Sequence, residues 1–150
     1  MFTARDKNDF FKVIFISFFT FLIIGCSKQN PQEVIIKHAH VYVPLKGSMM
    51  TSGYLSMENT SNKSFEITGI SCSSSRAEIH ETKVNAAGIM TMEKKDTFVL
   101  NPLEKIIFVP GGKHIMLWGL SDSTENYLDC SFNISGEDPI NFKFTVQKRG

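Results

Sequence analysis

Hydrophobic and polar residues alternate along most of the chain from Glu33 onward. Residues at every second position point to the same face of a β-strand, so this pattern predicts strands with one buried side and one solvent-facing side. Clusters of Asn, Gly, Ser and Pro separate the alternating segments and are typical of turns. Many short strands with turns between them favour an all-β fold, either a sandwich or a Greek-key barrel. The predicted strands are residues 34–42, 53–58, 64–71, 76–82, 89–93, 97–100, 105–109, 114–118, 127–134 and 140–147.

The first thirty residues have a different pattern. Arg5, Lys7 and Lys12 form a basic start to an almost unbroken apolar run over residues 10–24, which ends before Cys26. The run is shorter than the ~20 residues that a membrane-spanning helix needs. A basic start, a short apolar run and a small residue before a cysteine are together typical of a lipoprotein signal peptide.

We therefore predict a signal peptide over residues 1–25, a lipid on Cys26, a polar tether over residues 26–32 and a folded domain over residues 33–150. An uncleaved N-terminal anchor is the alternative. Both interpretations place the domain outside the cytoplasmic membrane, on the periplasmic side of a bacterial membrane. Ser27 stands where an Asp often retains lipoproteins at the inner membrane, which favours the outer membrane.

Charge excludes some classes of partner. The chain carries 16 basic and 15 acidic side chains, and the predicted signal peptide holds three and two of them, so 13 of each sign remain. No basic stripe indicates nucleic-acid binding, and no run of one sign indicates a polyanionic partner. About 120 residues are enough for one domain with its own core. We expect a nearly neutral monomer.

Two cysteines remain once Cys26 is assigned to the lipid. Cys72 and Cys130 form an even pair in an exported protein, where disulfides are stable. A disulfide between strands and a pair of buried free thiols are both consistent with the sequence.

Two histidines and two methionines form the candidate site of this chain: His80, Met92, His114 and Met116. Thioether sulfur is soft and uncharged, so it favours Cu(I) over zinc, calcium or magnesium. It also forms no disulfide, which suits a copper site in an oxidising compartment. The sequence therefore predicts a Cu(I) site with two nitrogen and two sulfur ligands.

Alternation also predicts which way these side chains point. Ile79, Ile115 and Leu117 are expected to face the core, which places the four ligands on the opposite, exposed side. Met90 shares the face of Met92 and competes with it as a ligand.

A second pair of histidines lies on the first predicted strand. His38 and His40 are expected on one strand face, with Met49 and Met50 in the following loop. These residues are consistent with a weak metal site, but a solvent-facing strand that binds no metal is favoured over it.

The candidate site resembles that of the periplasmic copper chaperones called PCuAC. Their signature is a His or Met, ten residues, a Met, twenty-one residues and then His-x-Met. Met92 and His114 are separated by the same twenty-one residues, whereas eleven residues separate His80 from Met92. We therefore expect one extra residue in the hairpin over residues 84–88, where an insertion is tolerated and leaves His80 paired with Met92. The segments that carry the resemblance are residues 53–59, 77–82, 88–92 and 110–120.

The resemblance covers roughly residues 33–147 and implies a cupredoxin-like β-barrel that binds one Cu(I). It also implies delivery of the ion to the CuA centre of cytochrome c oxidase, directly or through a thiol-containing assembly factor. The chain departs from the family at His40 and Val41, and at Cys72 and Cys130, which PCuAC proteins lack.

Other classes of protein fit the sequence less well. An electron-transfer cupredoxin needs a Cys between two His ligands and an axial Met, but no His follows Cys130. An enzyme is not expected, because the chain lacks a nucleophile elbow, a paired-carboxylate motif and a phosphate-binding glycine loop. The remaining alternative is a β-sandwich lipoprotein without metal that acts as a structural or assembly partner.

Overall fold

A computed structural model describes residues 33–121 and 125–148 of the chain. The predicted signal peptide, Cys26 and the tether lie outside these residues. Gln32–Gly150 form one compact unit. The strands of the described part are β1 (Val34–Tyr42), β2 (Met50–Asn59), β3 (Phe65–Cys72), β4 (Arg76–Val84), β5 (Met90–Lys94), β6 (Phe98–Leu100), β7 (Lys105–Phe108), β8 (Lys113–Trp118), β9 (Tyr127–Ile134) and β10 (Glu137–Gln147).

The all-β prediction is confirmed, and each predicted strand corresponds to an observed one. β1 and β9 have the predicted bounds, while β2 and β10 each begin three residues earlier than predicted. The described residues contain no helix long and apolar enough to cross a membrane.

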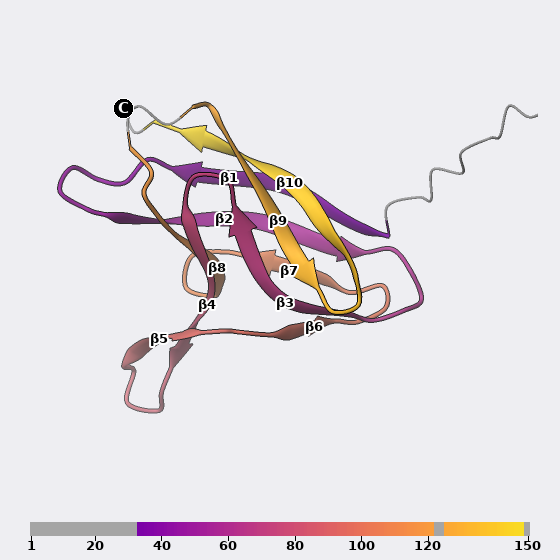
Figure 1. Cartoon of the computed structure of the whole chain (residues 1–150). Helices are drawn as coiled ribbons and strands as arrows, with labels where there is room; N and C mark the ends of the chain where they lie inside the picture. The colour runs from indigo at the N-terminus through magenta and orange to yellow at the C-terminus, as the bar shows by residue number, and fades with distance from the viewer. Residues whose placement is uncertain (1–32, 122–124, 149–150) are drawn as a thin grey trace, which may run out of the picture. The chain divides into compact units, whose positions relative to one another are not determined.

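The strands form one curled sheet in the order β5-β4-β8-β2-β1-β10-β9-β3-β6, and β7 pairs with the far end of β2 (Figure 1). β1 runs parallel to β10, and the other pairs are antiparallel. β8 covers the first half of β2, opposite residues 50–53, and β7 covers the second half, opposite residues 55–58. β8 therefore lies inside the sheet, between β4 and β2.

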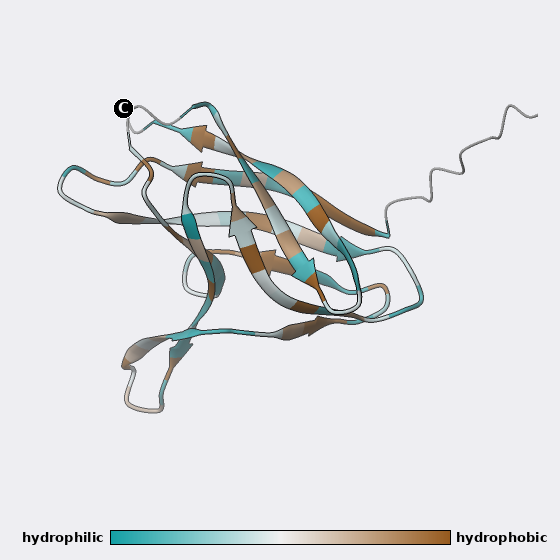
Figure 2. Cartoon of the chain, viewed as in Figure 1, coloured by the Kyte–Doolittle hydropathy of each residue, from teal (hydrophilic) through white to brown (hydrophobic). Residues whose placement is uncertain are grey.

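Aromatic and aliphatic side chains fill the space that the sheet encloses. Phe108, Phe132 and Phe144 are at most 1% exposed, and Phe142 stacks on Phe132 with 5.1 Å between ring centroids. Apolar and polar bands alternate along β9 and β10, as the period-two pattern requires (Figure 2). Ile79, Ile115 and Leu117 are buried in this core, as predicted.

The hairpin of β4 and β5 extends away from the rest of the sheet (Figure 1). β5 is an edge strand of the sheet, and all five of its residues are exposed. The turn is closed by Asn85, whose side chain accepts hydrogen bonds from the backbone N–H groups of Ala87 and Ile89. Gly88 has φ of +77°, which glycine adopts without the strain of a Cβ.

Candidate metal centre

The two predicted histidine ligands lie side by side on neighbouring strands. His80 on β4 is directly opposite His114 on β8, and Glu78 is directly opposite Met116. Residues paired in this way point to the same side of a sheet. Three of the four predicted ligands therefore share one region of the face that points away from the core.

The spacing of the two imidazole rings fits a shared metal ion. Their centroids are 6.0 Å apart and the rings are tilted by 37°. Metal–nitrogen bonds of about 2.0–2.1 Å place an ion roughly 3 Å from the centre of each ring, so one ion spans centroids up to about 6 Å apart. The observed spacing of 6.0 Å lies at this limit.

Each imidazole has one ring nitrogen that is available to bind a metal ion. A carbonyl or carboxylate oxygen only accepts hydrogen bonds, so a ring nitrogen bound to one carries the proton. His114 donates from Nδ1 to the Gly112 carbonyl at 3.0 Å, which leaves its Nε2 with the lone pair. His80 donates from Nε2 to Glu78 at 3.0 Å, which leaves its Nδ1 with the lone pair. That Nδ1 is buried without a hydrogen-bond partner, and a bound ion would satisfy it.

The turn before β8 fixes the position of His114. Gly112 donates its N–H to the Val109 carbonyl, and Val109 donates its own to the Lys113 carbonyl. The Gly112 carbonyl accepts from Nδ1 of His114 and also from the backbone N–H of Thr82 at 3.1 Å. The turn, the histidine ring and β4 are thereby held to one another.

His114 and Met116 are buried, which the sequence did not predict. They are 4% and 6% exposed, so the expectation of an exposed ligand cluster is wrong for these two residues. The reason is that β8 has a strand on each side. His80 lies beside the ring of His114, and Ser52 on β2 donates its hydroxyl to the Met116 sulfur at 3.6 Å.

Met92 lies on the same face of the sheet but on the exposed hairpin. It pairs with Thr82, while His80 pairs with Lys94. The expected pairing of His80 with Met92 is therefore wrong: the two are diagonal neighbours, which typically lie about 7–8 Å apart in a sheet. Met92 is 60% exposed.

Met90 is the more distant competitor of Met92. It pairs with Val84, one further step along the same face from His80, and is 70% exposed. The register thus favours Met92 over Met90 as the fourth ligand.

A carboxylate and a cation border the two histidines. Arg76 donates to Glu78 at 2.5 Å and holds the pKa of this carboxyl below its ordinary value, and the hydrogen bond from His80 acts in the same direction. The guanidinium of Arg76 lies 4.9 Å from the ring centroid of Trp118, at cation–π distance. Glu78 is therefore ionised at neutral pH and able to accept both hydrogen bonds.

Sequence comparison assigns the chain to a family. The model of the family described as "Putative lipoprotein LpqE-like" matches residues 34–147. The chain belongs to the LpqE-like family. This description names a lipoprotein, in accord with the predicted lipid on Cys26. No curated protein matches the sequence.

Solved structures of low sequence identity share the fold of this LpqE-like protein. A copper-bound PCuAC domain from PmoF2 has a TM-score of 0.60 at 18% identity, over 78% of this chain and 94% of that one. An apo PCuAC domain from PmoF1 has 0.63 at 18%, over 78% and 95%. Cu(I)-bound DR1885 from Deinococcus radiodurans has 0.57 at 19%, over 83% and 84%. The expected PCuAC-type β-fold is confirmed.

In the LpqE-like protein, the second histidine pair, His38 and His40, lies where the regular pairing of β1 with β2 is interrupted. The register of β1 against β2 shifts between Lys37 and His40, and His38 has φ of +57°. This bulge breaks the alternation on which the prediction of a shared strand face depended. Nδ1 of His40 donates a hydrogen bond to the His38 carbonyl at 2.9 Å. No group of three or more His, Cys, Asp or Glu side chains placed to hold a metal occurs in the described part of the chain.

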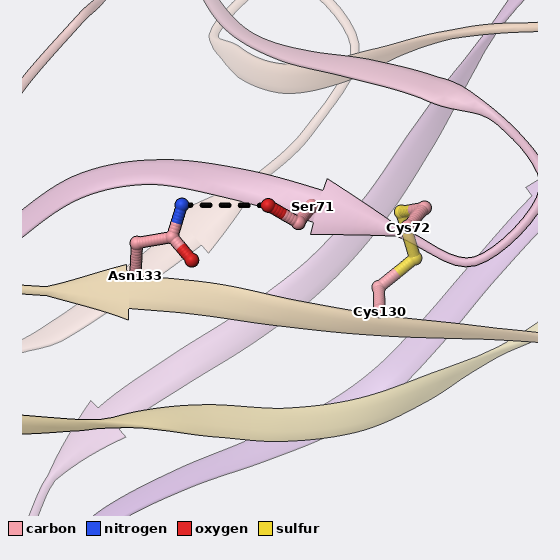
Figure 3. The surroundings of a disulfide bond; sticks show 4 residues. All are labelled: Ser71, Cys72, Cys130 and Asn133. Carbon is pink, nitrogen blue, oxygen red and sulfur yellow. Dashed lines mark hydrogen bonds between the residues drawn. A yellow bond between two sulfur atoms is a disulfide. The ribbon is translucent and has the colours of Figure 1, made fainter.

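The two remaining cysteines are joined by a disulfide in the structure (Figure 3). Cys72 ends β3 and lies directly opposite Cys130 on β9, so the bond links two paired strands. Asn133 donates to the Ser71 hydroxyl at 3.4 Å nearby. Of the two states that the sequence left open, the structure has the disulfide.

Sequence reasoning missed three polar or aromatic neighbours of the site: Ser52, Glu78 and Trp118. A signal for Glu78 was present, because a residue two positions before His80 on a strand shares its face. Ser52 and Trp118 depend on how β2, β4 and β8 pair, which the local sequence does not reveal.

Proposed function

We propose that this LpqE-like protein is a copper chaperone that binds one Cu(I) through His80, Met92, His114 and Met116. It carries the ion as cargo to an extracytoplasmic acceptor, such as the CuA centre of cytochrome c oxidase, and catalyses no reaction. The observation that supports this most strongly is the buried Nδ1 of His80, which has no hydrogen-bond partner. The ring centroid of His80 lies 6.0 Å from that of His114.

The ligand set suits a monovalent soft ion. Two neutral imidazoles and two thioethers add no negative charge, so Cu(I) is favoured over divalent ions that prefer carboxylate or thiolate ligands. No thiol proton has to be released on binding, and a site without thiolates leaves the ion open to exchange with an acceptor's thiolates. Tight holding and transfer are then compatible.

Unequal burial of the ligands supports an order of release. His114 and Met116 are held inside the sheet, whereas Met92 lies on the exposed hairpin. An acceptor reaches Met92 first, so its sulfur is the ligand to be replaced first. The remaining three ligands then hold the ion while the acceptor adds its own.

The proposed setting follows from the N-terminal sequence. A lipid on Cys26 anchors the protein to a membrane, and the domain works as a monomer on the periplasmic side, with the outer membrane preferred. Its partners are the CuA-bearing subunit of the oxidase or the oxidase's assembly factors.

One observation favours the alternative of a lipoprotein that binds no metal. Met116 is nearly as buried as Met57, which is 0% exposed and belongs to the core, and methionine often fills interior gaps. In this alternative Met116 only packs, and the protein acts as a structural or assembly partner.

Competition for Cu(I) against a coloured chelator distinguishes the two functions. Gln32–Gly150 contain the whole core, so the part after Cys26 is a suitable parent. A variant with Met92→Leu, His114→Gln and Met116→Leu removes three ligands, and Met57→Leu is the matched control for loss of a buried thioether.

We expect one tightly held equivalent in the parent and in the control, and its loss in the triple variant with an unchanged circular dichroism spectrum. Equal, weak binding by all three proteins would contradict the chaperone. Met92→Leu alone replaces an exposed side chain, so it tests the site even if the triple variant does not fold.

A further inference from the structure

Glu78 and His80 lie on the same face of β4, and their side chains are in contact. Its Oε2 accepts the hydrogen bond from Nε2 of His80 at 3.0 Å, and the two side chains are 16% and 17% exposed. Glu78 also lies directly opposite Met116 on β8. A carboxylate that is largely shielded from water therefore borders both a nitrogen and a sulfur ligand.

The hydrogen bond decides which nitrogen of His80 is available. An ionised carboxylate has no hydrogen to give, so Nε2 must carry the proton and Nδ1 the lone pair of the neutral ring. Nδ1 is the buried atom without a partner. The opposite tautomer would place a proton on Nδ1, where nothing accepts it, and would leave Nε2 without a hydrogen to donate to Glu78.

Glu78 is itself held in place and is not free to bind an ion. Its other oxygen, Oε1, accepts from Arg76 at 2.5 Å. Arg76 in turn lies over the ring of Trp118, directly across the β4–β8 pair. Each carboxylate oxygen thus has a cationic or N–H partner, and the carboxylate acts on the site through His80.

We infer that Glu78 is a positioning residue of the copper site, which fixes the tautomer and orientation of His80 so that Nδ1 faces the ion. The inference rests on the proposed function. Carboxylate partners of metal-bound histidines orient the ring and raise its basicity, and their removal commonly weakens metal binding about 10–100-fold. Glu78 has the contacts of such a partner.

Three variants separate this role from general stability. Glu78→Ala removes the acceptor. Glu78→Gln restores an amide oxygen that accepts from Nε2, while Arg76, 71% exposed, is free to turn away. Glu81→Ala is the matched control, because Glu81 lies on the opposite face of β4 and pairs with Lys113 and Lys95.

Two measurements test the role in the part of the chain after Cys26. Long-range ¹H–¹⁵N NMR of the apo protein reports which nitrogen of His80 is protonated, and chelator competition reports Cu(I) affinity. We expect Nε2–H in the parent and a mixture of tautomers in Glu78→Ala. We also expect Glu78→Ala to weaken Cu(I) binding about 10–100-fold, with Glu78→Gln weakened less and Glu81→Ala unchanged.

Other outcomes overturn the inference. A folded parent with Nδ1–H at His80, or equal Cu(I) affinity for Glu78→Ala and Glu81→Ala in a parent that binds tightly, removes the role of Glu78 and leaves the chaperone intact. A parent that binds no Cu(I) removes the proposed function and this inference with it.

Discussion

His80 and His114 lie directly opposite each other on β4 and β8, with 6.0 Å between their ring centroids. Paired strands are rigid supports, so the two predicted nitrogen ligands and Met116 would already be in place before an ion arrived. Met92 differs, because it lies on an exposed edge strand two positions away from the His80 pair. The candidate site thus combines three predicted ligands on paired inner strands with one predicted ligand that is accessible.

Replacing the two hairpin methionines separately tests which of them completes the site. Met92→Leu should weaken Cu(I) binding by about tenfold or more, equivalent to ~1.4 kcal/mol, because one sulfur ligand is lost. Met90→Leu should leave the affinity within about twofold of the parent. Both side chains are exposed, so each change should alter the free energy of unfolding by less than about 0.5 kcal/mol. Chelator competition measures the first effect, and the reverse order of affinities would assign the ligand to Met90.

Removing the disulfide should lower stability without affecting copper binding. Cys72 and Cys130 are 58 residues apart in sequence, and loss of a native disulfide from a small exported domain typically costs about 2–5 kcal/mol. Neither cysteine belongs to the strands that carry the predicted ligands. Urea unfolding of a variant with Cys72→Ser and Cys130→Ser measures the loss.

Copper affinity supplies the control for this double variant. An unchanged affinity for Cu(I) is expected once the variant is folded at low temperature. A weaker affinity would show that the disulfide region is coupled to the site, and unchanged stability would show that the bond is not formed in solution.

Much of the fold could be predicted from the alternation of residues, and the faces of the ligands with it. Ile115 and Leu117 point to the core and His114 and Met116 point away, as a period of two requires. Alternation predicts the face of a side chain but not what covers that face. His114 and Met116 are buried by neighbouring strands whose pairing involves residues far away in the sequence.

Register was the other property that the sequence could not supply. The spacing from His80 to Met92 suggested that these two residues pair, but the turn closed by Asn85 sets Met92 opposite Thr82. At the first strand, the bulge at His38 shifts the pairing by one residue, and no Gly or Pro marks it in advance. Both departures depend on local backbone geometry that the pattern of apolar residues does not encode.

Asn59 is a buried polar residue whose loss should destabilise the fold. It is 1% exposed, and its side-chain amide donates to the carbonyls of Lys63 and Asn101, at 2.7 and 2.8 Å. Asn59→Ala removes both hydrogen bonds from a buried side chain and should lower the free energy of unfolding by about 1–3 kcal/mol. Asn133→Ala is the control, since its bond to Ser71 is exposed, and it should cost less than about 0.5 kcal/mol. Equal losses in chemical denaturation would show that burial of the Asn59 amide contributes little.

Glu81 should make stability depend on pH in the acid range. Lys113 donates a hydrogen bond to its carboxylate at 2.8 Å and holds its pKa below the ordinary value of 4.5. The unfolded chain then binds a proton at higher pH than the folded one, so the contribution of Glu81 to stability is present above about pH 4.5 and is lost as the pH falls through the lower, folded pKa.

Glu81→Gln removes this contribution at every pH. We expect the free energy of unfolding at pH 7 to fall by no more than about 1 kcal/mol, because the pair is partly exposed to solvent, and to decline less steeply than in the parent below pH 4.5. Urea unfolding at pH 7 and at several values below 4.5 measures both. Glu66→Gln, on the exposed side of β3, controls for the loss of a negative charge. Parallel pH profiles for the parent and Glu81→Gln would contradict the lowered pKa, since an unperturbed carboxyl binds its proton equally in both states and adds no slope.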